Sequence, residues 1–418
     1  MRSVCKTVYD YVFSVTKNQI NPSFSQDYLS TLAIINNICQ RCGSVVKENH
    51  CPECSELGLL TKVDYLYRLP GPIPYQAYQD QLQNLNLTSL QQQASNFIVD
   101  NIKTKQNCLI WAVCGAGKTE ISFEAIEYIL KQNKLVCFCI PRIDILYEIA
   151  ERLRQFFPNT KVSIVNGVIK EKEDTQIFVM TTNQLLKCKQ VFDLVIVDEV
   201  DAFPFSYHPK FMYALNTSLT ESGIYCCLTS TPSKMIEDLM LNTFIIYKRL
   251  HNYLLPEPHL RYLPTKNKFI YYWLFKKLFT KINRPQLIFV CNKQQCQKLS
   301  IFLQKILVNK KIDYVHSSKE DRRTLIEDFA NNKIDILITT PILERGVTFK
   351  DLDVYVMDSD NPLYDKASLV QIAGRCGRNP NFQEGKVYFY YQNYTDQIDS
   401  ACKQIKEMNN KAKKSSNK

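Results

Sequence analysis

Short apolar runs, many of them rich in β-branched residues, alternate along most of the chain with stretches of helical character. The runs are LIWAV, LVCFCI, SIVNGV, IFVMTT, LVIVDEV and YCCLTSTP, followed after a gap by QLIFVC, DYVHS, DILITT, VYVMD and KVYFYY. Runs of this kind that alternate with helices are typical of parallel sheets buried on both faces. The pattern predicts an α/β fold with two parallel-sheet lobes, at residues 77–240 and 266–400.

Four segments lie outside the two expected lobes. Residues 1–70 form an N-terminal region that is expected to hold a four-cysteine module at about 36–58, and residues 1–35 show no clear chemistry. The Pro- and Gly-rich stretch RLPGPIPYQ, at 68–76, is typical of a linker. A segment rich in proline and basic residues, 241–265, is expected to connect the lobes. The lysine-rich residues 401–418 are expected to be a disordered tail.

Length and composition favour a reducing, cytoplasmic setting. The 418 residues suffice for two or three domains with sizeable cores. No run of about 18 apolar residues is present, and polar and acidic breaks interrupt the N-terminal MRSVCKTVYDYVFSV. Neither a membrane span nor a signal peptide is therefore expected. The 16 cysteines do not form a spaced disulfide framework, and those in apolar runs are expected to be buried thiols: Cys137, Cys139, Cys226 and Cys227.

The positive charge of the chain is concentrated in two regions. Of the formal net charge of +11, residues 245–284 contribute +8 and residues 401–418 contribute +5, so the rest of the chain sums to about −2. Two basic regions suggest defined contacts with a polyanion. In KFIYYWLFKKLFTKI (268–282) a second explanation stays open, because the aromatic residues fit the buried face of an amphipathic helix with solvated lysines.

A glycine-rich segment, AVCGAGKT, follows the first apolar run at Ala112–Thr119. In a turn between a strand and a helix, its backbone N–H groups would face phosphate oxygens, and the helix N-terminus would add positive potential. Lys118 would reach the outer phosphates, and the Thr119 hydroxyl would bind Mg²⁺. Ala112 stands where the full P-loop pattern has glycine, and this shortened form is the one found in helicase-type motors.

A second motif, DEVD, closes the apolar run LVIVDEVD. At the end of a buried strand, Asp198 would hold the water shell of the metal and Glu199 would polarise the attacking water. The glycine-rich turn cradles phosphates and the acidic pair activates water, so each motif supplies what the other lacks. Together they predict hydrolysis of a nucleoside triphosphate.

Four cysteines form a third motif near the N-terminus. Cys39 and Cys42 make one CxxC pair, and Cys51 and Cys54 make another after eight intervening residues. Four thiolates in two tight knuckles suit a closed, tetrahedral and structural Zn²⁺ site, although the adjacent His50 could replace one thiol. A redox CxxC is the alternative, but it needs only one pair and leaves the second unexplained.

The order of the motifs resembles the superfamily 2 helicase-type ATPases, which implies two RecA-like lobes. In LTSLQQQA, Gln91 and Ala94 resemble the upstream motif that reads adenine. The further motifs follow in the expected order as PRID (141–144), TTNQLL (181–186), LTSTP (228–232), TTPILERGVTF (339–349) and QIAGRCGR (371–378). Ser230 departs from the superfamily pattern, which usually has alanine in the third motif.

Within that superfamily, the chain resembles the ComFA family of late competence proteins, DNA-uptake ATPases of Firmicutes. PRID, DEVDAFP, RLHNYLLPEP, ILERGVTF and QIAGRCGR carry this resemblance, together with a four-cysteine module placed before the motor. The primosomal helicase family PriA has a similar motor. However, its zinc-binding cysteines lie inside the second motor half, and its N-terminal DNA-binding region is large. The placement of the cysteines here favours the competence family.

The resemblance implies roles at individual positions of the nucleotide site. Gln371 would face the nucleotide from the second lobe, and Arg375 and Arg378 would act as arginine fingers on the transferring phosphoryl group. The residues expected to surround the nucleotide are Gln91, Gly115, Ala116, Gly117, Lys118, Thr119 and Glu120.

The resemblance also implies contacts with DNA and between the lobes. The positions expected to touch the sugar-phosphate backbone are Pro141, Arg142, Thr181 and Thr340. Thr229 and Thr231 would transmit the state of the nucleotide between the lobes. His316, in YVHSS, has either a phosphate-adjacent or inter-lobe role or a structural one.

The function implied is an ATP-dependent single-stranded DNA translocase that drives DNA uptake in natural competence. An ATP-switched DNA-binding adaptor and a PriA-like duplex helicase remain alternatives. The expected cofactors are ATP, Mg²⁺ and a structural Zn²⁺. The expected partners are single-stranded DNA, other competence proteins of the uptake machinery and the membrane DNA channel, and a homo-oligomer stays open. The expected location is the cytoplasm, either free or peripheral at the inner face of the membrane.

Overall fold

The computed structural model divides the chain into two compact units. One contains the residues up to Trp111 together with Gly117–Ile246, and the other contains Ala112–Ala116 together with Tyr247–Lys418. The structure describes residues 29–68, 77–79, 81–83, 85–166, 175–251, 253–263, 284–344, 349, 351–377 and 385–416.

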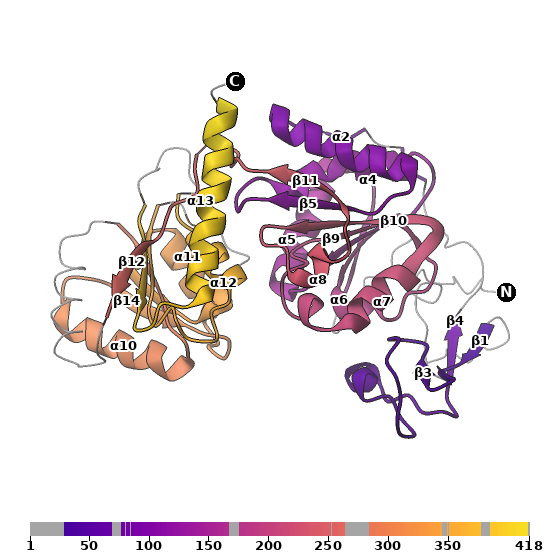
Figure 1. Ribbon diagram of the computed structural model, residues 1–418, viewed down its shortest axis with the longest axis horizontal. Coiled ribbons are helices and arrows are strands. Elements are labelled where there is room, and N and C mark those ends of the chain that lie inside the picture. Colours follow the sequence, from indigo (N-terminus) through magenta and orange to yellow (C-terminus); the bar gives the residue numbers. More distant parts are fainter. Residues whose placement is uncertain are drawn as a thin grey trace. The chain divides into compact units, whose positions relative to one another are not determined.

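A seven-stranded sheet forms the core of the first unit (Figure 1). Every pairing from β5 to β7 along this sheet is parallel, as the uninterrupted apolar runs predict. Almost every side chain of the central strands is buried. In spatial order the strands are β11 (Asn242–Ile246), β5 (Cys108–Ala112), β10 (Leu219–Thr229), β9 (Phe192–Val197), β6 (Val136–Ile140), β8 (Ile177–Thr181) and β7 (Val162–Val165).

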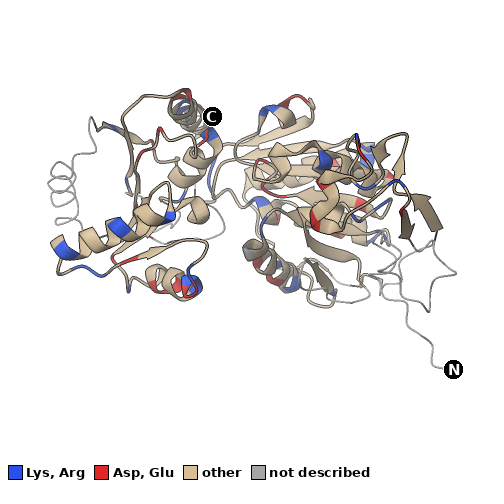
Figure 2. Cartoon of the chain, turned by 90° about the horizontal axis from the view of Figure 1, so that it is seen from below, with Lys and Arg blue, Asp and Glu red and all other residues tan. Residues whose placement is uncertain are grey.

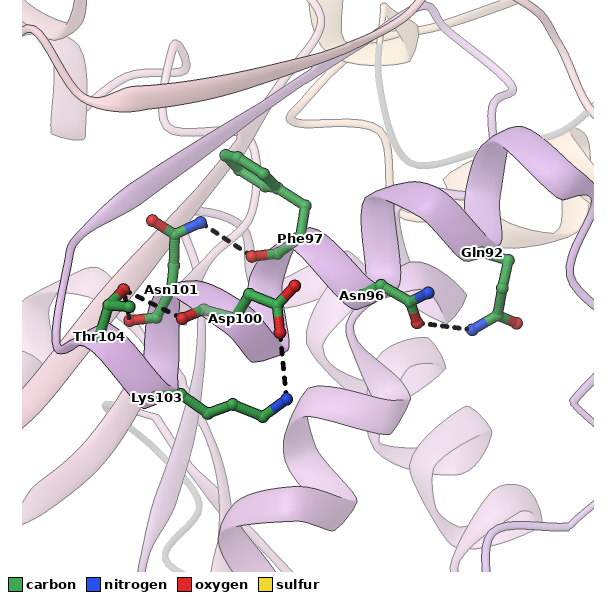
Figure 3. A network of polar contacts seen from close by, with 7 residues as sticks. All are labelled: Gln92, Asn96, Phe97, Asp100, Asn101, Lys103 and Thr104. Atoms are coloured by element: carbon green, nitrogen blue, oxygen red, sulfur yellow. Dashed lines mark hydrogen bonds and ion pairs between the residues drawn. The ribbon is translucent and has the colours of Figure 1, made fainter.

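Helix α2 (Ser89–Thr104) precedes the first strand of this sheet in the chain. The helices between the strands are α3 (Lys118–Ile121), α4 (Phe123–Leu130), α5 (Ile143–Phe156), α6 (Thr182–Leu185), α7 (Pro209–Ser218) and α8 (Lys234–Glu237), with the 3₁₀ turn η4 (Phe205–Tyr207) before α7. A capping box between Thr88 and Gln91 starts α2. Further along α2, polar side chains bond to one another and to the helix backbone, for example Lys103 to Asp100 at 3.0 Å (Figure 3). These local bonds fit a helix with one polar face.

The second unit is built on a six-stranded, wholly parallel sheet. In spatial order its strands are β12 (His259–Tyr262), β17 (Val387–Tyr391), β16 (Asp353–Val356), β13 (Gln286–Phe289), β15 (Ile336–Thr339) and β14 (Ile312–Val315). Its helices are α10 (Lys293–Ile306), α11 (Arg322–Ala330), α12 (Lys366–Ala373) and α13 (Asp396–Ser416), with the 3₁₀ turn η5 (Pro341–Leu343). The two sheets confirm the predicted fold of two parallel-sheet lobes.

Two predicted boundaries differ from the structure. The segment 241–265 is not only a connection, because it supplies edge strand β11 to the first sheet and edge strand β12 to the second. The sequence predicts a disordered tail at 401–418, whereas α13 extends to Ser416. The cause is an apolar stripe at helical spacing among the lysines, whose buried members are Ile398, Ala401, Ile405, Met408 and Ala412. The exposed lysines lie along this helix, near the end marked C in Figure 2.

The four-cysteine segment forms a small module within the first unit. Strand β1 (Leu29–Leu32) pairs with β4 (Tyr65–Arg68), so the ordered module is longer than the 36–58 expected from the cysteine spacing alone. Between these strands lie the β2–β3 hairpin (Ile34–Ile35 and Ile38–Cys39) and η3 (Pro52–Leu57).

The module docks on α7 of the first lobe (Figure 1). Its buried residues join the same apolar cluster as Phe211, Ala214 and Leu215 of α7. At the edge of this contact, Lys210 lies 3.3 Å from the Glu53 carboxylate and also donates to the Glu53 carbonyl. The module is therefore packed on the motor.

Some sequence predictions concern residues outside the described ranges. These are most of the linker at 68–76, the aromatic and basic stretch 268–282, and Arg378. Among the described residues, no helix has both the length and the apolar character needed to cross a membrane. The cysteines predicted to be buried thiols, Cys137, Cys139, Cys226 and Cys227, are fully buried.

Candidate active site and cysteine cluster

The glycine-rich segment forms the predicted turn between β5 and α3. Gly115 and Gly117 have φ values of +82° and +70°, in the left-handed region that favours glycine. Strand β5 ends at Ala112, and Lys118 is the first residue of α3. Lys118 and the buried Thr119 therefore come directly after a turn whose backbone conformation favours glycine.

The acidic motif follows β9 in the middle of the same sheet. Asp198 is buried, and its backbone N–H donates to the Cys139 carbonyl at 2.9 Å. Burial raises the pKa of Asp198 to about 6. The positive charge of Lys118 opposes this rise, whereas Glu199 and Asp201 add to it. The acidic motif and the P-loop lysine therefore lie within electrostatic range of each other.

Glu199 has an unusual backbone conformation for its residue type. Its φ of +52° is in the left-handed region, and its N–H donates to Asp198 Oδ1 at 2.8 Å. Such conformations are uncommon for residues other than glycine and gather at functional sites. An uncommon backbone conformation therefore lies inside the acidic motif.

The donor set of this site fits a magnesium ion. Mg²⁺ prefers oxygen ligands, and Thr119 and Asp198 supply a hydroxyl and a carboxylate. Three carboxyl groups, those of Asp198, Glu199 and Asp201, lie near one another and are opposed by Lys118. A divalent cation would relieve this excess of negative charge and favour the ionised form of Asp198.

Asp201, the last residue of DEVD, has a role that the sequence analysis did not assign. It accepts hydrogen bonds from Thr229 Oγ1 at 2.5 Å and from Thr231 Oγ1 at 2.7 Å. The Thr231 N–H in turn donates to Thr229 Oγ1 at 3.0 Å. These bonds connect the loop after β9 with the end of β10. Thr229 and Thr231, which the family resemblance singled out, therefore contact the acidic motif directly.

Two further candidates for nucleotide binding take part in local bonds of their own. Gln91 is buried, and its side-chain carbonyl accepts from the Thr88 backbone N–H at 2.9 Å and hydroxyl at 3.0 Å. Glu120 makes an ion pair with Arg152 at 3.0 Å. Ala116, in the turn, is buried. Contact of these residues with a nucleotide stays a prediction.

The candidate DNA contacts of the first lobe follow neighbouring strands. Pro141 and Arg142 come directly after β6, and Thr181 ends β8. Strands β6 and β8 are parallel, and Ile140 is paired with Thr181 in their register, so these residues lie at one edge of the sheet. In the other unit, Thr340 follows β15 and precedes η5. Their contact with DNA stays a prediction.

In the second lobe, the AGRCGR motif begins at the end of α12. Gln371 is buried in α12. Arg375 is also buried, and its Nε donates to the Glu344 carbonyl at 2.9 Å. His316 is half-buried, and its Nδ1 accepts from the Ser318 N–H at 3.3 Å, a bond that stabilises its own loop. The catalytic roles of Gln371 and Arg375 stay predictions.

Arg249 is a residue that the sequence analysis quoted only as part of RLHNYLLPEP. It is 4% exposed, and its guanidinium donates to three carbonyls of the AGRCGR motif. Nη1 lies 2.8 Å from the Cys376 oxygen and 2.7 Å from the Gly377 oxygen, and Nη2 lies 3.1 Å from the Gly374 oxygen. No local pattern signals these bonds, because more than 120 residues separate the partners.

The four cysteines of the N-terminal module converge on one point. Their Sγ atoms all lie within 4.8 Å of one another, and all four residues are buried. The Cys39–Cys54 and Cys42–Cys51 sulfur distances are 3.7 and 3.5 Å. Four thiolates at a Zn–S distance of about 2.3 Å stand about 3.8 Å apart in a tetrahedron, so the cluster fits zinc.

The surroundings of the cluster support a closed structural site. Gly43, with a φ of +74°, turns the chain after the first CxxC pair, and its N–H donates to the Cys39 carbonyl. His50 pairs through its backbone with Thr61 and is not a member of the converging group. Burial raises the pKa of Cys51 to about 12, so metal binding would have to release a proton from this thiol.

Comparisons with known proteins give family matches over both lobes. Residues 84–233 match the family described as the res subunit of type III restriction enzymes, and residues 266–380 match the helicase conserved C-terminal domain. The chain is 33% identical to the competence protein ComFA of Streptococcus pneumoniae over 401 residues, 90% of each chain. It is also 33% identical to ComFA of Bacillus subtilis over 345 residues, 78% of this chain and 73% of that one.

Two solved structures show the same fold at low sequence identity. S. cerevisiae Dbp5 bound to RNA and ADP BeF3 matches with a TM-score of 0.54 and 17% identity, covering 78% of this chain and 92% of that one. RecG bound to a three-way DNA junction matches with a TM-score of 0.54 and 17% identity, covering 82% and 49%.

The family matches, the two parallel-sheet lobes and the paired phosphate and acidic motifs together identify a superfamily 2 helicase-type ATPase. The four-cysteine module precedes the motor, in the place that the resemblance to the competence family led us to expect. With a third of its residues identical over nine-tenths of a curated relative, the chain belongs to the ComFA family of competence proteins.

Proposed function

We propose that this ATPase is a single-stranded DNA translocase that drives DNA uptake during natural competence. The observation that carries the proposal is the direct connection between the acidic motif and the end of β10, made by Asp201 with Thr229 and Thr231. A motor has to convert a change at the phosphates into movement of the protein. A hydrogen-bonded connection that begins in the catalytic loop is suited to this conversion.

The first lobe supplies the hydrolytic chemistry in this proposal. Lys118 would bind the phosphates, and the Thr119 hydroxyl would bind Mg²⁺. When bound, the ion would neutralise charge on the transferring phosphoryl group. Asp198 orients the metal through its carboxylate. Glu199 accepts a hydrogen bond from the attacking water and so holds the water for attack. Gln91 contributes to recognition of the adenine base.

The second lobe supplies charge that the first lobe lacks. Gln371, Arg375 and Arg378 are assigned to the nucleotide by resemblance, with the two arginines stabilising the transition state. A site completed only in some states of the motor would hydrolyse ATP in step with movement. The buried position of Arg375 supports a fixed orientation for this side chain, because the Glu344 carbonyl holds its Nε.

The single-stranded DNA is proposed to run over the edge of the sheet that carries Pro141, Arg142 and Thr181. Backbone amides, hydroxyls and a guanidinium at neighbouring strand ends suit phosphate oxygens and do not read sequence. Thr340 would extend this contact on the second lobe. Because phosphate contacts release counterions, binding is expected to weaken steeply with salt.

By family resemblance, the partners would be other competence proteins, including the membrane DNA channel, and a second copy of this chain is a further candidate. If the protein drives DNA through such a channel, it would be located at the inner face of the cell membrane. The zinc module, with Cys39, Cys42, Cys51 and Cys54 as ligands, would serve as a structural element in these contacts.

A translocation assay separates this proposal from an ATP-switched adaptor that holds DNA without moving along it. The substrate is single-stranded DNA with streptavidin bound to a biotin at either end. A translocase displaces streptavidin from one end only, at a rate that depends on ATP, and Glu199→Gln protein does not. An adaptor hydrolyses ATP in the presence of this DNA but leaves both ends blocked, and that result would contradict the proposal.

A further inference from the structure

We infer that Arg249 is a positioning residue for Arg375 of the AGRCGR motif. The guanidinium of Arg249 holds the turn Gly374–Gly377 by three hydrogen bonds of 2.7–3.1 Å, and Arg375 belongs to this turn. The inference rests on the proposed function, in which Arg375 acts on the phosphoryl group.

The end of a helix explains why a cation is bound here. Helix α12 ends at Ala373, and Gly374 is its C-terminal cap. The last carbonyls of a helix have no partner within the helix, and they carry partial negative charge. Arg249 supplies a donor to the oxygen of the cap residue Gly374, and it also donates to the Cys376 and Gly377 oxygens of the turn that follows the helix.

The geometry of the guanidinium explains why this cation is arginine. The group is a planar fork with five N–H donors, and here two of its nitrogens reach three carbonyls at once. A lysine ammonium lacks the planar fork and so cannot reproduce this arrangement. Arg249 is also buried, so the bonds are shielded from water and are stronger than they would be at the surface.

The segment that carries Arg249 is itself fixed at a second point in the same unit. The Leu255 backbone N–H donates to Asn409 Oδ1 at 2.8 Å, and Asn409 Nδ2 donates back to the Leu255 carbonyl at 2.9 Å. Asn409 lies on α13 and is buried. RLHNYLLPEP is therefore a strap within the second unit, held to the α12 turn by Arg249 and to α13 by Asn409.

The two ends of the strap predict different consequences when they are removed. Loss of Arg249 releases the turn that carries Arg375, so the chemical step should suffer. Loss of Asn409 releases a part of the strap that holds no catalytic group, so only stability should suffer. The pair Arg249→Ala and Asn409→Ala therefore separates positioning from general support of the fold.

The experiment measures steady-state ATP hydrolysis and thermal unfolding of the full chain for wild type, Arg249→Ala, Arg249→Lys, Asn409→Ala and Arg375→Ala. We expect kcat of Arg249→Ala to fall about 100-fold, the cost of a misplaced catalytic group, with KM for ATP changed by less than about threefold. Arg249→Lys should recover part of this loss, because an ammonium can still donate to one or two carbonyls. Asn409→Ala should lower the unfolding temperature and keep its kcat.

Several results would overturn the inference. One is a wild-type kcat for Arg249→Ala. Another is an equal loss of kcat in Asn409→Ala and Arg249→Ala at equal unfolding temperatures, which would assign Arg249 to stability alone. Wild-type turnover by Arg375→Ala would show that the turn does not serve the reaction. Absence of ATP hydrolysis by the wild-type protein would instead contradict the proposed function itself.

Discussion

The catalytic edge of the first sheet and the four-cysteine module are two sites in one unit, and they differ in how their ligands are arranged. At the catalytic edge, negative charges lie together near Lys118; they belong to Asp198, Glu199 and Asp201. This arrangement suits a metal ion and a nucleotide that bind and leave in each cycle. In the module, four sulfurs surround one point and use all the positions of a tetrahedral metal. The first arrangement is built for a reaction and the second for stability.

The largest expected effect is a loss of ATP hydrolysis that leaves the cysteine module unchanged. Lys118→Ala should lose binding of the phosphates. Glu199→Gln should lower ATP turnover by about 10³-fold, because the amide cannot accept a proton from the attacking water, while ATP still binds. Both variants should retain bound zinc. Turnover is measured by phosphate release and binding with a fluorescent ATP analogue, and wild-type turnover in either variant would remove that residue from the active site.

A second effect tests how the catalytic edge communicates with the rest of the motor. The double change Thr229→Val and Thr231→Val removes both hydroxyls that bond Asp201 and leaves a buried carboxylate without these donors. DNA-stimulated turnover should fall more than turnover without DNA, by about tenfold, equivalent to one hydrogen bond to a charged group. The matched control is Thr231→Ser, which keeps the hydroxyl. Equal losses with and without DNA would contradict a coupling role.

A third effect removes the metal from the module. The double change Cys39→Ser and Cys42→Ser should abolish zinc binding, because two of the four thiolates are lost. We expect turnover without DNA to persist and DNA binding or partner docking to weaken. Because the module shares its apolar cluster with α7, the unfolding temperature of the first lobe should also fall. Elemental analysis that finds well under one zinc per wild-type chain would contradict the site.

The smallest effect tests the docking of the module. A Cβ at Gly43 would lie 2.4 Å from the Tyr213 ring of α7, so Gly43→Ala should lower stability by about 1–3 kcal/mol. Gly58→Ala is the matched control, since Gly58 also has a positive φ but nothing lies within 4 Å of its added Cβ. The difference between the two unfolding free energies isolates the clash from backbone strain. Equal losses would indicate that the module does not rest on Tyr213.

Features encoded in short segments could be predicted from the sequence. The turn before Lys118, the strand before Asp198 and the two CxxC pairs each depend on neighbouring residues, and the structure confirms their local form. Features that depend on distant partners could not be predicted. The bonds of Asp201 to Thr229 and of Arg249 to the Gly374 turn join residues that are far apart in the chain.

At the C-terminus, the composition led to a wrong prediction of disorder. In the basic region at 245–284, it did not show which charged residues lie inside the fold. The lysines of α13 concealed an apolar stripe that includes Ile405 and Met408. Part of the basic charge of 245–284 is used within the fold, because Arg249 is buried and Arg284 lies 3.7 Å from Asp351. Net charge alone does not distinguish such arginines from residues available to DNA.

The central claim is that this chain couples ATP hydrolysis to single-stranded DNA. The most direct measurement is the rate of ATP hydrolysis by the purified protein with single-stranded DNA, with duplex DNA, with RNA and with no nucleic acid, using Glu199→Gln as the blank. We predict that single-stranded DNA stimulates turnover most and that the stimulation weakens as salt rises. An equal rate with and without single-stranded DNA, at a salt concentration where binding is observed, would contradict the account.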